Sequence, residues 1–442
     1  MKNFPPAPGL TPADWADSAR LARMGQLSKT ISDTPYLHWE QLRHRPPPAG
    51  YSVLEWWQAL KFKRQLSSSQ HDLLYGYGEQ RVCTSHNAAV EARLANLSRQ
   101  LGSPLQHDGD ITRANRDRYI SSSLMEEAIY SSLLEGTVAT RAAAKDMLRS
   151  GQMPTTIDER MIVNNHRAIE RVRELAHEPL TVAHVLELHS ILTDGTLADP
   201  GAAGRMQTAQ EERIVVWDKQ LNRSVHLPPP AGELPERMTR LVAFANAEDI
   251  ENERYTHPLL RSILLHFQLA FDHPFVDGNG RLARALFYWS MLRRGYWLTE
   301  FISISRQIYR NRNPYLLAYL YAESDQQDAT YFVIQQLDVI EQALAELQIY
   351  LKRKREEQHS IRQLTSAHTG LNPRQLALLR HALHKPDAIY THESHANSQG
   401  VSIITARSDL LQLVAMGFVS TARVGKKFIY RPADDLAKRL RG

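Results

Sequence analysis

A proline and two glycines interrupt a long apolar helical pattern, and this interruption constrains the fold more than any other feature. Apolar residues recur at helical spacing from Leu259 to Asp272 and again from Leu282 to Gly295. Pro274, Gly278 and Gly280 break the pattern between the two segments. The sequence therefore predicts two helices joined by a tight turn, which opens onto the N-terminus of the second helix.

The turn carries the parts of a phosphate site. Free N–H groups at a helix N-terminus bind anions, and glycines let the backbone approach them closely. Asn279 can add a side-chain donor, while Arg281 and Arg284 share a helix face and suit two successive phosphates. Asp277 is a hard oxygen ligand of the kind that holds Mg²⁺ together with phosphates, and His273 can act as a general base. Each residue alone also fits a turn, a cap or a solvated face, but the whole set in this order indicates phosphate chemistry.

The string from His273 to Arg284 resembles the signature of Fic-domain proteins, His-x-Phe-x-Asp/Glu-Gly-Asn-Gly-Arg-x-x-Arg, at every fixed position. The similarity extends over residues 115 to 345. The resemblance implies a mainly α fold, with a helical core and one small β-hairpin that serves as a flap. It also implies an enzyme that moves AMP from ATP onto a protein hydroxyl.

The resemblance also implies roles for individual residues. His273 would deprotonate the target hydroxyl, and Asp277 would hold Mg²⁺. Arg281 would bind the β-phosphate of ATP and Arg284 the γ-phosphate, while the glycine loop cradles the α- and β-phosphates. The nucleotide-binding residues expected on this basis are Gly278, Asn279, Gly280, Arg281, Arg284 and Tyr315.

A second motif lies upstream, where a helix from about residue 119 is expected to stop at Gly136, a natural C′ residue. The stretch from Ser131 to Gly136 resembles the inhibitory motif of the same family, Ser/Thr-x-x-x-Glu-Gly/Asn. In relatives its glutamate pairs with the last arginine of the active-site motif and blocks productive ATP placement; here the pair would be Glu135 and Arg284. The expected regulatory residues are Ser131, Glu135 and Gly136, which would place the chain in the N-terminally inhibited group. The alternative is a solvated glutamate before a helix end.

A β-hairpin is expected between residues 213 and 227, with strands at 213–217 and 224–227 and a turn at 218–223. In the family this flap adds a strand to the target peptide by main-chain pairing. The alternative is an ordinary surface hairpin. The target-binding flap residues expected here are Ile214, Val215, Val216 and Trp217.

The C-terminal segment differs in charge and pattern. The formal net charge of the chain is +5, and Leu371 to Gly442 alone holds eleven basic and five acidic residues. Helices at 373–383, 392–398 and 402–416, followed by strands at 418–423 and 427–431, resemble a winged helix-turn-helix. The third helix would enter a major groove, although winged helices also serve as protein-binding modules. The expected DNA-binding residues are Arg407, Lys426, Lys427 and Arg431.

Four segments are therefore expected. They are an N-terminal helical region (1–110) whose role the sequence does not indicate, a Fic domain (111–345), a helical linker (346–370) and a winged helix-turn-helix (371–442). A single cysteine, Cys83, fits a reducing compartment. Neither a signal peptide nor an apolar run of about 18 residues is visible, so we expect a cytoplasmic protein without a membrane partner.

The function expected from the sequence is a protein adenylyltransferase that is restrained by its own Glu135 and uses ATP and Mg²⁺. Its partners would be target proteins with a Ser, Thr or Tyr hydroxyl, the chain itself included, and DNA through the C-terminal module; a homodimer is left open. One alternative is transfer of another nucleotide, or removal of AMP, at the same site. An alternative of another class is a DNA-binding regulator whose Fic core senses ATP, against which the intact His273 argues.

Overall fold

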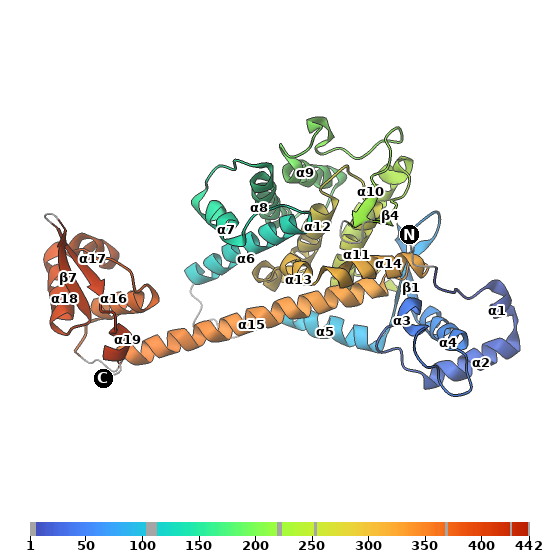
Figure 1. The fold of residues 1–442 in the computed structure, drawn as a ribbon, viewed down its shortest axis with the longest axis horizontal. Helices are drawn as coiled ribbons and strands as arrows, with labels where there is room; N and C mark the ends of the chain where they lie inside the picture. Colours follow the sequence, from blue (N-terminus) through green and yellow to red (C-terminus); the bar gives the residue numbers. More distant parts are fainter. Residues whose placement is uncertain are drawn as a thin grey trace. The chain divides into compact units, whose positions relative to one another are not determined.

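The computed structural model describes residues 6–102, 113–218, 223–251, 254–366, 370–424 and 427–440. The chain forms two compact units, Met1–Ala345 and Glu346–Gly442. Helices dominate, and the strands of the described residues form four separate two-stranded antiparallel hairpins (Figure 1). The mainly helical fold with a small hairpin near the expected site confirms the predicted fold class. Among the described residues, no helix is both long and apolar enough to cross a bilayer.

The N-terminal region is not purely helical, which corrects the expectation for residues 1–110. The strands of its hairpin do not alternate polar and apolar residues, so their pattern gave no strand signal. Tertiary contacts hold the hairpin instead, since the backbone of Cys83 bonds to the Gln327 carbonyl (3.1 Å) and to the Ala329 N–H (2.9 Å). The elements are α1 (Pro12–Ala16), α2 (Ser18–Thr30), α3 (Trp39–Leu42), α4 (Val53–Leu66), β1 (Ser68–Tyr75), β2 (Arg81–Ser85) and α5 (Ala88–Gly102).

The centre of the first unit is a helix whose residues are almost all buried, α11 (Pro258–Asp272). Because nearly all of its residues are buried, it has neighbours on all sides. It packs most extensively against α12 (Asn279–Arg293), with which it forms the predicted helix–turn–helix. The surrounding helices are α6 (Arg113–Leu134), α7 (Arg141–Ser150), α8 (Ile157–Leu175), α9 (Val182–Thr193), α10 (Leu234–Asn246), α13 (Ile304–Arg310) and α14 (Arg312–Ser324). The short pair β5 (Ile250–Glu251) and β6 (Arg254–Tyr255) lies between α10 and α11 in the sequence.

The flap hairpin is shorter than the sequence predicts. Its strands are β3 (Val216–Asp218) and β4 (Arg223–His226), with an irregular register between Val216 and Trp217. Residues 213–215, expected as strand, stay outside the ladder. The physical reason is that the Arg213 side chain bonds to the backbone at the end of α11, which ties this stretch to the core.

The helix that follows α14 is longer than expected. The expected linker at 346–370 includes a polar stretch at 360–370, but α15 spans Thr330–Ser366 and takes in most of it. The polar stretch contains neither proline nor glycine before Gly370. Without such a residue nothing in the sequence stops the helix.

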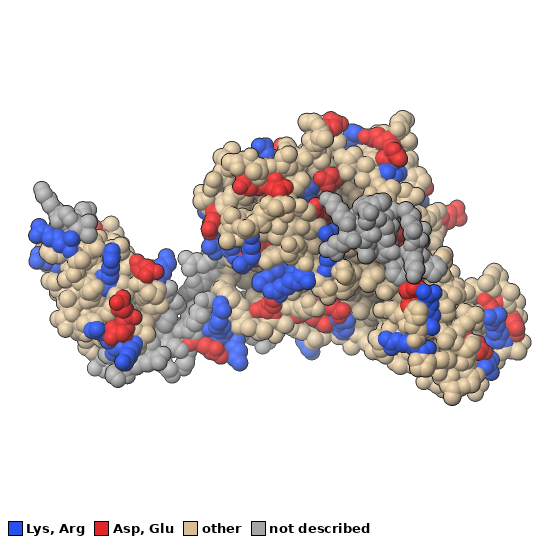
Figure 2. Space-filling view, viewed as in Figure 1, with Lys and Arg blue, Asp and Glu red and all other residues tan. Residues whose placement is uncertain are grey.

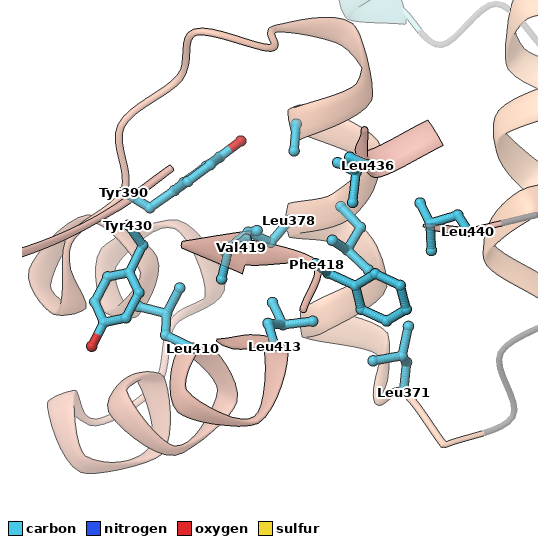
Figure 3. Close-up of a cluster of buried hydrophobic side chains, with 12 residues drawn as sticks. Leu371, Leu378, Tyr390, Leu410, Leu413, Phe418, Val419, Tyr430, Leu436 and Leu440 are labelled. Carbon is cyan, nitrogen blue, oxygen red and sulfur yellow. The ribbon is translucent and has the colours of Figure 1, made fainter. Parts of the chain in front are cut away.

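The second unit contains the expected three helices and hairpin. They are α16 (Pro373–His384), α17 (His392–Gln399), α18 (Ile403–Ala415), β7 (Val419–Val424) and β8 (Lys427–Pro432), followed by the short α19 (Leu436–Arg439). Its core places Leu378 of α16, Leu410 and Leu413 of α18, and Phe418 and Tyr430 of the hairpin region in one cluster (Figure 3). The unit therefore has a hydrophobic core of its own.

Candidate active site

The turn between α11 and α12 has the backbone conformation that its glycines and proline indicate. His273 ends α11 in the left-handed region with φ 46°, and Gly278 precedes α12 with φ 84°. A Cβ on Gly278 would lie 3.0 Å from Thr193 Cγ2 in addition to being strained. Helix α12 begins at Asn279, so its free N–H groups face the turn.

Asn279 fastens the turn from inside. Its Oδ1 accepts from the Phe275 N–H (2.9 Å) and its Nδ2 donates to the Phe275 carbonyl (2.8 Å). Its side chain is buried. Both ends of the side chain therefore bond to the loop itself, and the expected use of this amide as a phosphate donor stays a prediction.

His189 of α9 supports the same loop, and sequence reasoning gave it no role of its own. Its ring stacks on Phe275 with centroids 3.8 Å apart. Its Nδ1 accepts from the Gly204 N–H (2.9 Å), so Nε2 carries the proton that bonds to the Asp277 carbonyl (2.9 Å). Burial lowers the pKa of this imidazole to about 4, which keeps it in the neutral form that these bonds need. A lone histidine in a helical stretch far upstream of the motif gives no indication of this role.

The two motifs meet at Arg284. Its Nη2 donates to Glu135 Oε1 (2.8 Å) and to the Ser131 carbonyl (2.9 Å), while its Nε donates to Ser131 Oγ (2.9 Å). The guanidinium side chain is 3% exposed, so little water competes for it. Gly136, with φ 100°, ends this segment in the left-handed conformation expected of a helix stop. The expected pair of Glu135 and Arg284 is thus formed.

The carboxylate of Glu135 also lies on the N-terminal turn of α12. A Cβ added to Gly280 would overlap Glu135 Oε1, so only glycine allows this approach. Burial alone would raise the pKa of the Glu135 carboxyl, but Arg284 and then Arg281 hold it below its usual value. An ionised carboxylate therefore occupies the position at which this helix end favours an anion.

Arg281 lies deeper than Arg284 and faces a different partner. Its side chain is fully buried, with Nη1 donating to the Leu192 carbonyl (3.0 Å) and Nη2 lying 3.4 Å from Asp277 Oδ2. Its Nε has no hydrogen-bond partner among the described residues. The two arginines share a helix face as predicted, but packing gives them separate surroundings.

Asp277 is held at the surface of the loop. Its Oδ1 accepts from the Gly278 N–H (2.6 Å), and its side chain is 47% exposed. Within the described ranges no three His, Cys, Asp or Glu side chains converge on one point. A half-exposed carboxylate beside an anion site fits Mg²⁺, which takes one or two protein carboxylates and fills its shell with phosphate and water oxygens.

A cavity runs from the helix N-terminus along α14. Gly280, Glu135 and Arg284 line its polar part, and His273 lines its wall. Tyr315 is also there, with its hydroxyl 3.0 Å from His266 Nε2. The apolar lining suits a flat ring and comes from Leu134, Ala270, Phe271, Leu316, Tyr319 and Leu320.

His273 is a neutral base in this cavity. Burial is the main cause that lowers the pKa of its imidazole to about 4. Nearby His226 and Arg213 lower it further, whereas a hydrogen bond to the Ala270 carbonyl and the charge of Glu135 raise it. The ring is therefore unprotonated near neutral pH and able to accept a proton.

The N-terminal region, whose role the sequence does not indicate, contacts α14, the helix that lines one wall of the cavity. His38 stacks on Tyr321 of α14 with centroids 4.3 Å apart, and its Nε2 lies 3.1 Å from Ser324 Oγ. Tyr77 reaches the same helix with its hydroxyl 3.3 Å from Glu323 Oε2. Residues 6–102 therefore help to fix α14 against the core.

The remaining predicted residues belong to the flap hairpin and to the second unit. Ile214 and Val215 are exposed at 42% and 39%, and Val216 lines the cavity. Nothing is described of the Trp217 and Lys427 side chains, and Lys426 lies outside the described residues altogether. In the second unit Arg407 and Arg431 are exposed.

Comparisons with known proteins agree with this geometry. Residues 179–291 match the model of the Fic/DOC family. The protein adenylyltransferase Fic of Drosophila melanogaster is 27% identical over 226 residues, which cover 49% of this chain and 42% of that protein. The protein of the same name from Drosophila willistoni is 28% identical over 215 residues, 47% of this chain and 39% of that one. The chain thus spans less than half the length of these curated relatives.

A solved structure shows the fold. The crystal structure of a Fic family protein from Desulfovibrio desulfuricans G20 aligns over 78% of this chain and 95% of its own, with a TM-score of 0.52 and 18% sequence identity.

Proposed function

Because the chain is a Fic-domain protein, we propose that it transfers AMP from ATP to a hydroxyl group of a target protein. The observation that carries the proposal is the cavity in which a neutral histidine, a helix N-terminus and a buried arginine converge. An α-phosphorus placed near His273 would be attacked by the target hydroxyl while pyrophosphate leaves. The curated relatives named as adenylyltransferases support this reaction.

In this reaction His273 takes the proton of the attacking hydroxyl at its free imidazole nitrogen. The backbone N–H groups of Asn279 and Gly280 stabilise the charge that develops on the phosphoryl oxygens. Arg284 binds the γ-phosphate and thereby sets where the α-phosphorus lies. Arg281, whose Nε has no partner among the described residues, supplies charge at the β-phosphate.

Mg²⁺ would be held by Asp277 and by phosphate oxygens, and it would neutralise the leaving pyrophosphate. The neighbouring residues hold the Asp277 carboxylate in a fixed orientation. The Gly278 N–H bond to Oδ1 fixes the direction of that group and leaves its other oxygen beside Arg281.

We further propose that Glu135 restrains the enzyme. Its carboxylate bonds to the Arg284 guanidinium and lies against the N-terminal turn of α12. The γ-phosphate would therefore meet a negative charge at the place where it needs a positive one. The decisive experiment incubates the Glu135→Gly protein with ATP and Mg²⁺ and searches it by mass spectrometry for added AMP. A different added nucleotide, or removal of AMP from a modified target, would point to the alternative reactions at this site.

The metal proposal makes a direct prediction. Transfer by the Glu135→Gly protein should stop in EDTA and return with Mg²⁺ or Mn²⁺, whereas the same protein with Asp277→Ala should stay inactive after metal is restored. The reason is that the pyrophosphate would leave with its charge uncompensated. The measurement is incorporation of α-labelled ATP into protein, with Asp194→Ala as a control because Asp194 is exposed and lies outside the cavity. Full incorporation in chelator would refute a metal role for Asp277.

The second unit supports a separate proposal, duplex DNA binding. Exposed Arg407 on α18 and Arg431 on β8 fit a helix in the major groove and a wing at the backbone. Exposed Ile403 and Ile404 at the start of α18 instead suit a protein partner. Figure 2 shows Lys and Arg of this unit interspersed with Asp and Glu on the visible face. The order of three helices and a hairpin is what favours DNA.

If this unit binds DNA, affinity should fall steeply with salt, with a log–log slope of about −0.9 for each phosphate neutralised. Arg431→Ala should flatten that slope by about one unit, and Lys426→Ala with Lys427→Ala by about two. Arg407→Ala should change sequence preference more than slope. Titration of labelled duplexes by the full-length protein at several salt concentrations tests this, with Glu135→Gly as the control. Failure to bind any duplex at low salt would favour the protein-binding module.

A further inference from the structure

The backbone carbonyls at the end of α11 accept hydrogen bonds from the flap hairpin and from the residues just before it. The Phe271 carbonyl accepts from His226 Nε2 (2.6 Å). The Asp272 and His273 carbonyls accept from Arg213 Nη2 (2.7 and 2.9 Å). The Pro274 carbonyl accepts from the Gln207 N–H (2.8 Å). Four successive carbonyls thus accept from Gln207 and Arg213, which precede β3, and from His226, which ends β4.

This arrangement is unusual for a helix end. The last carbonyls of a helix have no partner within it, and a glycine in the left-handed conformation commonly allows the chain to satisfy them. Here the residue in that conformation is His273, with φ 46°. A side chain other than glycine is strained in this region and stays there only when its surroundings hold it. The flap supplies that restraint.

Arg213 is the centre of the restraint. Its Nε donates to the Pro229 carbonyl (2.7 Å), and its Nη1 donates to the Gln207 side chain. Arg213 enters the flap and Pro229 follows it, so one guanidinium joins both legs of the hairpin to the backbone of His273. The planar fork fixes all of these directions at once, which the single point charge of lysine cannot do.

We propose that Arg213 is a positioning residue that couples the flap to the backbone of His273, so that a peptide seated on the flap sets the place of the base. The inference rests on the proposed function, in which His273 is the base and the flap receives the target. We therefore expect the position and orientation of the His273 ring to depend on Arg213, although Arg213 touches neither ATP nor the reacting hydroxyl.

The test uses full-length protein with Glu135→Gly and compares Arg213→Lys, Arg213→Ala and the control Arg205→Ala. Arg205 lies in the same segment but pairs with Glu211 at the surface. Arg213→Lys should lower kcat about 10²-fold, because misplacement of a catalytic group by about 1 Å has an effect of that size. The KM for ATP should stay unchanged, since the phosphate residues are untouched. Arg205→Ala should match the parent.

The pH profile separates positioning from charge. Arg213 helps to lower the pKa of His273, so Arg213→Ala should raise that pKa and move the acid limb of kcat to higher pH. Arg213→Lys keeps the charge, so its acid limb should stay in place while its kcat falls. Full kcat in Arg213→Lys, or unchanged kcat for folded Arg213→Ala, would overturn the inference.

A second readout keeps the inference apart from the proposed function. If the Glu135→Gly parent transfers no AMP, the proposed function fails, and the ring signals of His273 in nucleotide-free protein decide the structural claim. These signals, assigned by comparison with His273→Ala, should shift in both Arg213 variants and not in Arg205→Ala. Identical ring signals in all variants would refute the coupling.

Discussion

Replacing His273 by alanine in the Glu135→Gly protein should lower AMP transfer by about 10²–10⁴-fold, the usual effect of losing a general base. ATP should still bind, because the phosphate-binding groups lie in the turn and on α12, and the alanine leaves them in place. The measurement is incorporation of α-labelled ATP beside nucleotide binding by calorimetry. Because His273 ends α11, circular dichroism of the variant must match that of the parent.

The same assignment fixes a pH dependence. Burial lowers the pKa of His273 to about 4, and the base acts only as the neutral ring. Transfer should therefore stay level as the pH falls from 7 and decline only as it approaches that value, when the ring takes up a proton. An acid limb centred near pH 6.5 would mean that another group titrates. Unchanged incorporation by His273→Ala would remove the base assignment altogether.

The second large effect is expected at Glu135. The Glu135→Gly protein should modify itself or a target about 10- to 100-fold faster than the wild type. That range follows from a hydrogen bond between charged groups, worth about 1.5–3 kcal/mol, which Arg284 would exchange for one to the γ-phosphate. Glycine also removes the carboxylate from the end of α12, where it competes with the nucleotide. The measurement is the initial rate of incorporation at low ATP concentration.

Two further variants test whether the charge of Glu135 is what restrains AMP transfer. Glu135→Gln keeps the length of the side chain but loses its charge, so its initial rate of AMP incorporation should lie between those of the wild type and Glu135→Gly. Combining Arg284→Ala with Glu135→Gly should abolish the gain, because ATP would lose its γ-phosphate partner. A Glu135→Gly rate equal to the wild type would show that the contact with Arg284 is structural and that it does not restrain the enzyme.

The sequence alone determined what lies within one loop and its two helices. The break at Pro274, Gly278 and Gly280 fixed the turn, because no continuous helix passes such a run. The spacing of Arg281 and Arg284 placed both on the first turns of α12. The stop at Gly136 followed from the same local rule, and so did the helices and hairpin of the second unit.

Tertiary structure decided which partners those residues meet. Nothing local indicates that Arg281 meets the Leu192 carbonyl or that His189 supports the loop. The hairpin β1–β2 exists because it pairs with the stretch before α15, and the flap strand starts late because Arg213 is anchored to α11. These contacts join segments far apart in the chain. They depend on how helices pack, and residue spacing within one segment carries no information about that packing.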